Sequence, residues 1–404
     1  MTVTILPSAP SGSVAAPPSK SMAHRLLLCA GLTIGESIVR GLAPSEDVLA
    51  TVDCLRALGV RCVRRGGDVV VSGYTLHCGT EGATLPCRES ASTLRFFLPL
   101  CLFGPPITLT GSRRLLARPL EAYRTLCEKQ GIRFEKGEEA VTVEGTLRPG
   151  EFRLPGDVSS QFVSGLLFAL PGLDGDSVIR LRPPVVSRSY IDMTMAALRR
   201  FGVETRWTDR ESIAVPGRQY YHFVSEATVE GDWSNAAPFL ALGVSVTGLD
   251  GNSLQGDKVC AEYFRLLDAG RPTLDVTDCP DLAPLLMAYA AMRSGAALTG
   301  TRRLRWKESD RGWAMAEELE KFGVRVQIGA DSITVEGGLR SPTAPLDGHG
   351  DHRIVMALSV LCVQTGGVIK GAEAVDKSFP DFFEKLQSAG VGMRFDRRER
   401  KQTT

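Results

Sequence analysis

Long apolar runs are absent from this chain, because no stretch reaches the roughly 18 residues that a membrane-spanning helix needs. No charged segment followed by an apolar core opens the sequence, so we expect no signal peptide and a cytoplasmic protein. Excess charge is missing too: 47 Lys and Arg stand against 46 Asp and Glu, a net charge of +1. That balance argues against a nucleic-acid or membrane partner.

Metal-binding patterns are also missing. The ten cysteines form no C-x-x-C pair, and only five histidines accompany them. Several cysteines stand inside apolar runs, where a reduced thiol packs as a small hydrophobic group. No glycine-rich nucleotide loop of the common types occurs. We therefore expect buried thiols and no metal. The cysteines are at positions 29, 54, 62, 78, 87, 101, 127, 260, 279 and 362.

The chain does contain a sixfold repeat. One recurring phrase is an amphipathic helix that ends in Gly and precedes a short strand pair, as in "PLEAYRTLCEKQGIRFEKGEEAVTVEG". The residue just after a helix often adopts the left-handed backbone conformation, which glycine tolerates best, and this explains why Gly ends the phrase's helix. The copy around "CAEYFRLLDAGRPTLDVTD" is degenerate. The glycines are Gly59, Gly131, Gly202, Gly270, Gly323 and Gly390, with spacings of 72, 71, 68, 53 and 67 residues.

A second phrase, a polar start followed by an almost wholly apolar helix, interleaves with the first. A helix that is apolar on all sides is buried. A unit of so few elements must pack on its neighbours, so six copies predict an α/β protein of α+β repeats in two domains of three units, each around buried parallel helices. Parallel helix starts add their partial positive charges and attract anions. The polar starts contain Lys20, Ser92, Ser160, Ser234, Asp281 and His352.

Two motifs of the first half suit an anion. In "SKSMAHR", Lys20 supplies a mobile charge and Arg25 a planar fork for oxyanions. In "VSSQF", two hydroxyls and an amide at Ser159, Ser160 and Gln161 can bind phosphate or a polyol, although helix capping alone also explains them.

The second half carries more charge. "WKESDR" places Lys307 and Arg311 four residues apart with Glu308 between them, which suits a carboxylate beside an anion site as well as a solvated charge run. Asp281 stands in "CPDLAPLL", which we interpret as a buried helix without other charge, and buried carboxylates are usually paired or catalytic.

Further cations stand near helix starts. "GDHR" puts His352 and Arg353 before an apolar run, and Lys377 precedes the last helix. Packing does not explain a His–Arg pair there. With Arg118, these cations and acids indicate anionic substrates and proton transfer among two carboxylates and a lysine.

These motifs resemble the 5-enolpyruvylshikimate-3-phosphate synthase family, the 3-phosphoshikimate 1-carboxyvinyltransferases of aromatic amino acid biosynthesis, within the enolpyruvyl transferases. The resemblance runs along the whole chain. The matching blocks, in the family's order, are "SKSMAHR", "ESASTLR", "ARPL", "SSQF", "SRSYID", "EGDWSNAA", "PDLAPL", "KESDR", "DHRIVMA" and "KSFPDFF".

The resemblance implies two domains, each of three βαβαββ units around buried parallel helices, an inside-out α/β barrel. Residues 1–18 with 230–404 form domain I, which carries Asp281, Glu308, Arg311, His352, Arg353 and Lys377. Residues 19–229 form domain II, which carries Arg118, Ser159, Ser160, Gln161 and Tyr190.

It also implies the reaction: the enolpyruvyl group of phosphoenolpyruvate moves to the 5-hydroxyl of shikimate-3-phosphate, and phosphate leaves. No metal or organic cofactor takes part, and we expect a monomer. The expected catalytic residues are Lys20, Asp281 and Glu308. Those for shikimate-3-phosphate are Lys20, Ser21, Arg25, Ser159, Ser160, Gln161, Ser187, Tyr190, Asp281 and Lys307. Those for phosphoenolpyruvate are Lys20, Ala91, Arg118, Gln161, Arg311, His352, Arg353 and Lys377.

The chain departs from the family text in "ESASTLR", where Glu89 replaces Asn, Ala91 replaces Gly and Ser92 replaces Thr. A methyl group at Ala91 intrudes where the inhibitor glyphosate, longer than phosphoenolpyruvate, places its end, so we expect reduced glyphosate sensitivity. Arg303 stands where many members have Asn or Glu, and its role stays open.

Three other kinds of protein share part of this pattern. UDP-N-acetylglucosamine enolpyruvyl transferase has Lys-Asn in the first motif and a catalytic loop cysteine; here the text is Lys-Ser, and Cys127 falls in an amphipathic helix. RNA 3′-phosphate cyclase is built from the same repeat, but a nucleic-acid enzyme is expected to carry a stripe of basic residues, which a net charge of +1 does not suggest. A non-enzymatic repeat protein has no need of Asp281 and Glu308.

Overall fold

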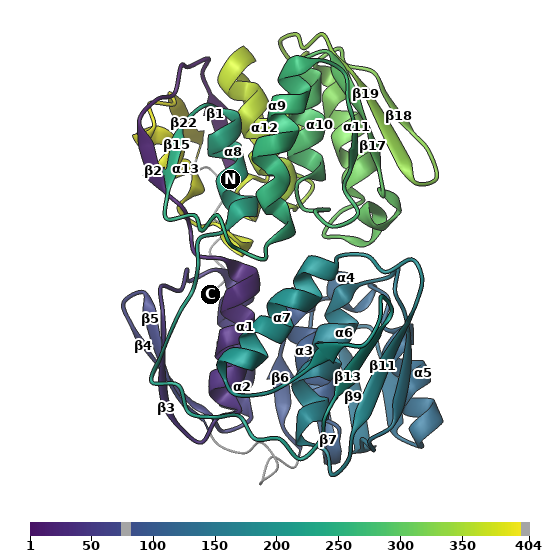
Figure 1. Ribbon diagram of the computed structural model, residues 1–404. Helices are drawn as coiled ribbons and strands as arrows, with labels where there is room; N and C mark the ends of the chain where they lie inside the picture. The colour runs from purple at the N-terminus through teal and green to yellow at the C-terminus, as the bar shows by residue number, and fades with distance from the viewer. Residues whose placement is uncertain (74–81, 397–404) are drawn as a thin grey trace. The chain divides into compact units, whose positions relative to one another are not determined.

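The computed structural model describes residues 1–73 and 82–396. The chain divides into two compact units (Figure 1): unit 1 holds residues 1–17 and the chain from residue 231 onward, and unit 2 holds residues 18–230. The expected boundaries lie one residue away at each junction. The reason is backbone pairing: the Ser19 amide donates to the Glu230 carbonyl within unit 2, whereas the Asp232 amide donates to the Pro17 carbonyl within unit 1 (both 2.8 Å).

Unit 2 contains three four-stranded sheets of one topology, each a parallel pair followed by an antiparallel hairpin. The strand orders are β14-β3-β5-β4, β6-β7-β9-β8 and β10-β11-β13-β12. The strands are β3 (Gly35–Arg40), β4 (Arg61–Arg65), β5 (Asp68–Gly73), β6 (Thr84–Pro86), β7 (Phe103–Thr110), β8 (Arg133–Lys136), β9 (Ala140–Thr146), β10 (Glu151–Pro155), β11 (Ser177–Arg182), β12 (Arg206–Trp207), β13 (Ser212–Val215) and β14 (Glu226–Thr228).

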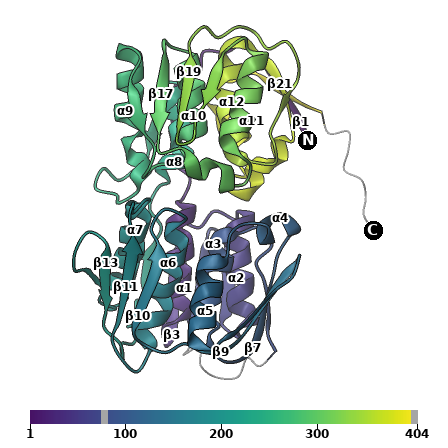
Figure 2. The same ribbon diagram turned by 90° about the vertical axis from the view of Figure 1, so that its right-hand side faces the viewer.

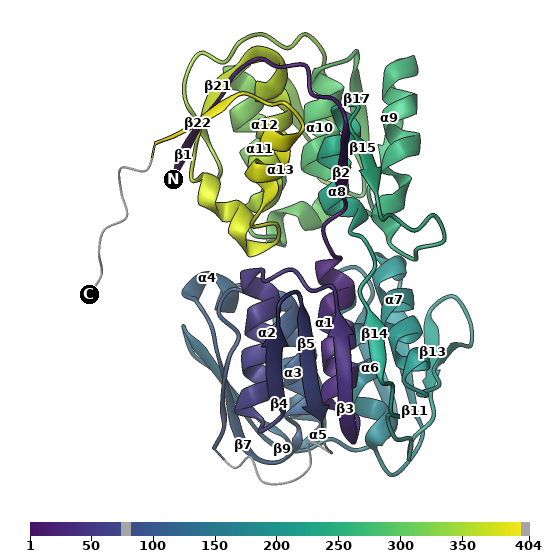
Figure 3. The same ribbon diagram turned by 90° about the vertical axis from the view of Figure 1, so that its left-hand side faces the viewer.

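Figures 2 and 3 show the helices of unit 2 running alongside these sheets. The apolar helices predicted to be buried are α1 (Lys20–Gly31), α3 (Ala91–Leu100) and α6 (Ser160–Ala169), and their residues after the first turn are buried on all sides. The amphipathic helices are α2 (Glu46–Ala57), α5 (Glu121–Gln130) and α7 (Arg188–Arg200), and a short α4 spans Arg113–Leu116.

Unit 1 repeats this plan with two changes. Its helices are α8 (Trp233–Ala241), α10 (Ala283–Ala291) and α12 (His352–Thr365), which are buried, and α9 (Cys260–Ala269), α11 (Arg311–Lys321) and α13 (Phe382–Ser388). Its strands are β1 (Thr2–Ile5), β2 (Ser13–Ala15), β15 (Ser245–Thr247), β16 (Thr273–Asp275), β17 (Gly295–Thr299), β18 (Val326–Ile328), β19 (Ser332–Glu336), β20 (Leu346–Asp347), β21 (Gly367–Lys370) and β22 (Met393–Asp396).

The first change is a sheet closed by both chain ends. Its order is β20-β21-β1-β22, so the hairpin of the other units is replaced by β1 and β22.

The second change is a shortened repeat. The degenerate copy keeps only the parallel pair β15-β2, and among the described residues it has no hairpin. The spacing of 53 residues from Gly270 to Gly323 already reflects this loss, because α9 leads directly into β16.

The interior of each unit is apolar and closely packed. All of α10 is buried, as its uncharged sequence predicts, and buried and partly exposed residues alternate along β19. Nine cysteines are free and buried, and Cys78 lies outside the described residues. Among the residues that the structure describes, no helix combines the length and apolar character that crossing a membrane requires.

The close approach of α3 and α6 depends on Gly165. A Cβ atom there would lie 2.2 Å from the Tyr123 hydroxyl and 2.3 Å from the Arg95 carbonyl oxygen, which are themselves hydrogen-bonded at 2.8 Å. We predict that Gly165→Ala lowers the free energy of unfolding by about 1–3 kcal/mol, because the overpacked backbone must shift.

Urea denaturation followed by circular dichroism measures this effect. Gly137→Ala is the matched control in the same unit: its nearest neighbour is the Ala140 carbonyl oxygen at 3.7 Å, an ordinary contact. Equal unfolding midpoints for the two variants would contradict the packing argument.

Candidate active site

The polar residues of unit 1 gather where its buried and outer helices begin. Asp281 lies in the turn before α10, which starts at Ala283, so the expectation that this carboxylate stands on the helix is wrong. The helix starts later because Pro284 occupies its first turn, where its missing N–H costs nothing. Lys307 and Glu308 follow the short helix η3 (Arg302–Trp306) and precede α11.

Arg311, the first residue of α11, is the centre of this cluster. Its Nη1 donates to Asp281 Oδ1 (2.7 Å), its Nη2 to Glu308 Oε2 (2.9 Å) and its Nε to Asp351 Oδ2 (2.9 Å). Its side chain is 1% exposed. Lys307 Nζ adds a second bond to Asp281 Oδ1 at 2.9 Å. The two expected acids therefore share one guanidinium.

These contacts set the ionisation of the cluster. Burial disfavours the charged form of Asp281, but Lys307, Arg311 and Arg353 outweigh it and hold the pKa of this carboxyl well below its usual range. Burial lowers the pKa of Lys307, although Asp281 opposes the shift. Asp281 is therefore ionised at neutral pH and can accept a proton or a hydrogen bond.

The start of α12 adds the next cations. Asp351 caps this helix by accepting from the Arg353 amide (2.9 Å) while it binds Arg311. Arg353 Nη1 donates to Asn235 Oδ1 (2.8 Å), and its Nη2 lies 3.7 Å from Asp281 Oδ2. The helix start thus brings a second guanidinium to Asp281.

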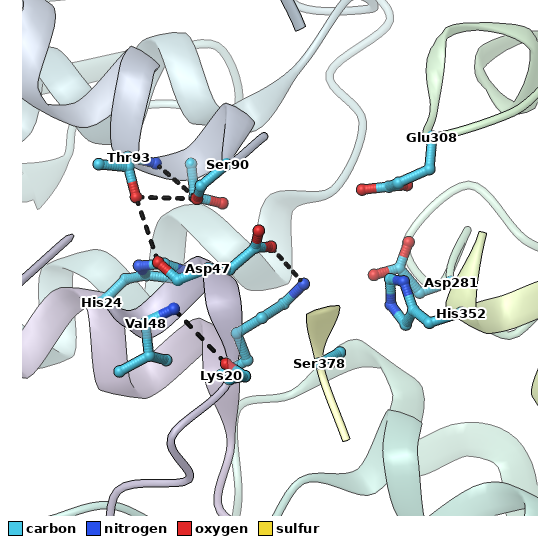
Figure 4. Close-up of polar contacts among 12 residues, drawn as sticks. Lys20, His24, Asp47, Val48, Ser90, Thr93, Asp281, Glu308, His352 and Ser378 are labelled. Carbon is cyan, nitrogen blue, oxygen red and sulfur yellow. Dashed lines mark hydrogen bonds and ion pairs between the residues drawn. The ribbon is translucent and has the colours of Figure 1, made fainter. Parts of the chain in front are cut away.

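The remaining expected residues of unit 1 are buried near these helix ends. His352 (Figure 4) is the first residue of α12, and its Nδ1 lies 3.7 Å from Asp351 Oδ1. Lys377 ends the short helix η4 (Ala372–Lys377). Arg303, on η3, donates from Nη2 to the Thr277 carbonyl (2.6 Å), so it ties η3 to the segment that leads to Asp281.

In unit 2, Lys20 begins α1 and forms an ion pair with Asp47 of α2 (Nζ to Oδ2, 2.9 Å; Figure 4). Arg25, one turn on, donates to the Thr194 hydroxyl (2.8 Å) and to the Ser21 and Tyr190 carbonyls (2.6 and 2.8 Å). Burial lowers the pKa of Arg25 to about 10, so it stays charged at neutral pH. These bonds join the start of α1 to α7.

The start of α6 forms a second polar group in unit 2. Ser159 caps this helix through the Gln161 amide. The Gln161 side chain accepts from Arg95 Nη1 (2.6 Å) and donates to Ser92 Oγ (2.9 Å), which joins α6 to α3. Ser160 is buried at the same helix start.

Ala91, Arg118, Ser187 and Tyr190 lie at or beside other helix starts. Ala91 is the first residue of α3 and is buried. Ser187 precedes α7 with φ of +53°, a left-handed conformation that a non-glycine residue adopts at a cost. Arg118 follows α4. All the expected residues of unit 2 except Arg25, which lies in the second turn of α1, stand at or beside helix ends.

Sequence reasoning missed several partners. Asp47 follows the Ser45 cap of α2, and its only signal was the helix-start pattern "PSED". Asn235 is the third residue of α8, and Arg95 lies one turn into α3. His24 binds the Thr51 hydroxyl (Nδ1 to Oγ1, 2.7 Å), and burial lowers its pKa to about 3, so it is neutral.

Removing Arg311 tests the electrostatics of unit 1. We predict that Arg311→Gln lowers the free energy of unfolding at neutral pH by about 3–5 kcal/mol, since it leaves buried carboxylates uncompensated. Without Arg311 the pKa of Asp281 rises. The stabilisation that comes from the low pKa is present above the carboxyl's unfolded value and is lost as the pH falls from that value through the lower folded one. The deficit should therefore shrink at about pH 3.

Denaturant titrations at both pH values measure the deficit. Arg305→Gln, which removes an exposed guanidinium of η3, is the control. Its free energy of unfolding should stay within about 0.5 kcal/mol of that of the parent. A deficit that is the same at both pH values would refute the electrostatic explanation.

Comparisons with known proteins point to one family. The family model "EPSP synthase (3-phosphoshikimate 1-carboxyvinyltransferase)" matches residues 6–271 and 269–386. A 3-phosphoshikimate 1-carboxyvinyltransferase of Clostridium novyi is 35% identical over 96% of this chain and 97% of the relative. That of Clostridium kluyveri is 37% identical with the same coverage.

A solved structure shows the same fold. The EPSP synthase of Acinetobacter baumannii superposes with a TM-score of 0.79 at 24% identity, over 98% of this chain and all of that one. The matches cover both units and all the motifs described above. The chain therefore belongs to the EPSP synthase (3-phosphoshikimate 1-carboxyvinyltransferase) family.

Proposed function

We propose that Asp281 and Glu308 carry out the proton transfers of this family's reaction in this chain. The reaction moves the enolpyruvyl group of phosphoenolpyruvate to the 5-hydroxyl of shikimate-3-phosphate and releases phosphate, a step of the shikimate pathway. The observation that supports the assignment is the ionised Asp281 held between Lys307 and Arg311, with Glu308 on the same guanidinium.

The proton steps follow from these positions. Asp281 takes the proton of the 5-hydroxyl as the hydroxyl oxygen bonds to C2 of phosphoenolpyruvate, and Glu308, which must carry a proton at this stage, gives it to the methylene carbon. A tetrahedral intermediate results. Glu308 then takes back one methyl proton as the C2–phosphate bond breaks, which restores the double bond, and the proton on Asp281 passes to the leaving phosphate. Lys20 acts as the third catalytic group, a cation beside the developing charges.

Binding is assigned to helix starts and their cations. Helix N-termini favour anions, and guanidinium groups bind carboxylate and phosphate in two-point contacts. We assign shikimate-3-phosphate to Lys20, Ser21, Arg25, Ser159, Ser160, Gln161, Ser187, Tyr190, Asp281 and Lys307. We assign phosphoenolpyruvate to Lys20, Ala91, Arg118, Gln161, Arg311, His352, Arg353 and Lys377.

The proposal extends to the setting of the enzyme. It is a cytoplasmic monomer that acts on two small anions, without a nucleic-acid or membrane partner. The net charge of +1 supports the absence of a nucleic-acid partner, because proteins that bind nucleic acid usually have a basic surface.

Phosphate release by the purified protein tests the assignment. With shikimate-3-phosphate and phosphoenolpyruvate, Asp281→Asn and Glu308→Gln should lose about 10²- to 10⁴-fold in turnover, since each removes one proton-transfer group and keeps the side-chain shape. Calorimetry should still detect shikimate-3-phosphate binding.

The matched control is Glu320→Gln, an exposed carboxylate of α11, which should keep full turnover. Full turnover in either acid variant would overturn the roles. UDP-N-acetylglucosamine serves as the competing acceptor, and phosphate release with it alone would overturn the acceptor assignment.

Ala91 yields a separate prediction. Replacing this buried first residue of α3 with Gly removes the methyl group that we place against the end of glyphosate. We expect Ala91→Gly to bind glyphosate about tenfold more tightly, equivalent to about 1.4 kcal/mol.

The change in glyphosate affinity is measured as glyphosate inhibition of phosphate release at a fixed phosphoenolpyruvate concentration. Ala122→Gly, in the first turn of the outer helix α5, is the control for the loss of helix propensity and should leave inhibition unchanged. Unchanged inhibition in Ala91→Gly would refute the steric argument.

A further inference from the structure

Glu318 is a buried carboxylate of α11 that the reaction does not use. Its side chain is fully shielded from solvent, seven residues and about two helical turns beyond Arg311. It binds Lys321 Nζ through both oxygens (2.8 and 2.9 Å). Its oxygens also contact His349 Nε2 (3.0 Å) and accept from the Asp347 amide (3.1 Å). A buried carboxylate with this many partners is a fixed anchor.

The segment that Glu318 binds is a strained turn. Residues 348–350 connect β20, which ends at Asp347, to the Asp351 cap of α12, and His349 adopts φ of +49° there. A non-glycine residue pays for a left-handed conformation and keeps it only where its surroundings enforce it. The His349 amide bonds to Asp347 Oδ1 (2.6 Å), and the ring bonds to Glu318, so both contacts hold the turn.

The turn leads directly to the cluster around Arg311. Asp351, two residues after His349, accepts from Arg311 and from the Arg353 amide. Helix α11 is therefore joined to the 347–353 segment at two places: through Arg311 and Asp351 at its start, and through Glu318 two turns later. The two contacts fix how far Asp351 stands from Arg311.

We propose that Glu318 is a positioning residue for phosphoenolpyruvate: through His349 and the Asp347 amide it holds the strained turn that aims Asp351 at Arg311 and sets the start of α12. The proposal rests on the proposed function, which assigns Arg311, His352 and Arg353 to phosphoenolpyruvate.

The same contact makes the turn sensitive to pH. The Glu318 hydrogen bond raises the pKa of His349 against the effect of partial burial, and Asp347 and Glu317 act in the same direction. Lys321, which shares the Glu318 carboxylate, is the facing cation. The charged His349 strengthens the contact below its unfolded pKa, and this contribution is lost as the pH rises through the raised folded value.

Glu317, Glu318 and His349 also bring three ligand-type atoms within 4.8 Å of one another. A divalent cation is a poor fit, since the Lys321 ammonium already lies on both Glu318 oxygens. The two interpretations separate at Glu317, whose exposed carboxylate would bind a metal but makes none of the hydrogen bonds that hold the turn.

Steady-state kinetics of four variants test the proposal. Glu318→Gln and His349→Asn should raise KM for phosphoenolpyruvate about tenfold, with a smaller change in KM for shikimate-3-phosphate, because a hydrogen bond to a charged group is lost. His349→Gly, which relieves the left-handed strain but lacks the ring, should also raise it. Glu317→Gln should leave it unchanged. In the parent this KM should rise with pH above about 6.5, and His349→Asn should lose that rise.

Each outcome decides one point. A parent-like KM in His349→Gly would show that only the backbone conformation matters and would overturn the role of the ring. A raised KM in Glu317→Gln, or a change on adding EDTA, would replace the proposal with a metal site. Equal increases for both substrates would indicate general loss of structure and overturn it.

The titration of His349 by NMR is independent of turnover. Its pKa should fall towards the ordinary value in Glu318→Gln, while circular dichroism shows whether that variant folds. His349→Asn, at a half-buried site, supplies the kinetic test if Glu318→Gln does not fold. An inactive parent protein would refute the proposed function alone, whereas an unshifted His349 would refute the contact.

Discussion

One buried guanidinium holds three carboxylates of unit 1 together. Arg311 donates to Asp281, Glu308 and Asp351, and these carboxylates would repel one another without it. A lysine could not replace it, because only the planar guanidinium directs several donors along fixed lines from a single buried site. The positions of α11, of the α12 cap and of the turn before α10 all follow from this one side chain.

The arrangement of helices was largely predictable from the sequence because its signals are local. An uncharged stretch such as α10 has to be buried, and the glycine that ends α5 adopts a left-handed conformation, with φ of +70° at Gly131. The lost hairpin after Gly270 also leaves a trace in the sequence, because the spacing from Gly270 to Gly323 is 53 residues and the other spacings are 67 to 72. The start of α10 was misjudged, since Asp281 resembles a helix residue until the turn that carries it is seen.

The candidate site was predictable by residue type but not by pairing. Lys20 and Arg311 stood out as cations at helix starts, and the family resemblance gave them roles. Their partners Asp47 and Asp351 belong to elements that only tertiary structure brings near, and single carboxylates in helix caps are common. Glu318 left no signal either, because on a helix surface a Glu three residues before Lys321 is ordinary.

The sheet that both chain ends complete has a consequence for biosynthesis. β1 lies between β21 and β22, so this strand must wait until residues 367–370 and 393–396 have been made before it finds both neighbours. Unit 2, a single continuous segment, needs no such delay and can assemble on the nascent chain. During translation, β1 is therefore an unpaired strand, and chaperones have most reason to bind the chain at that stage.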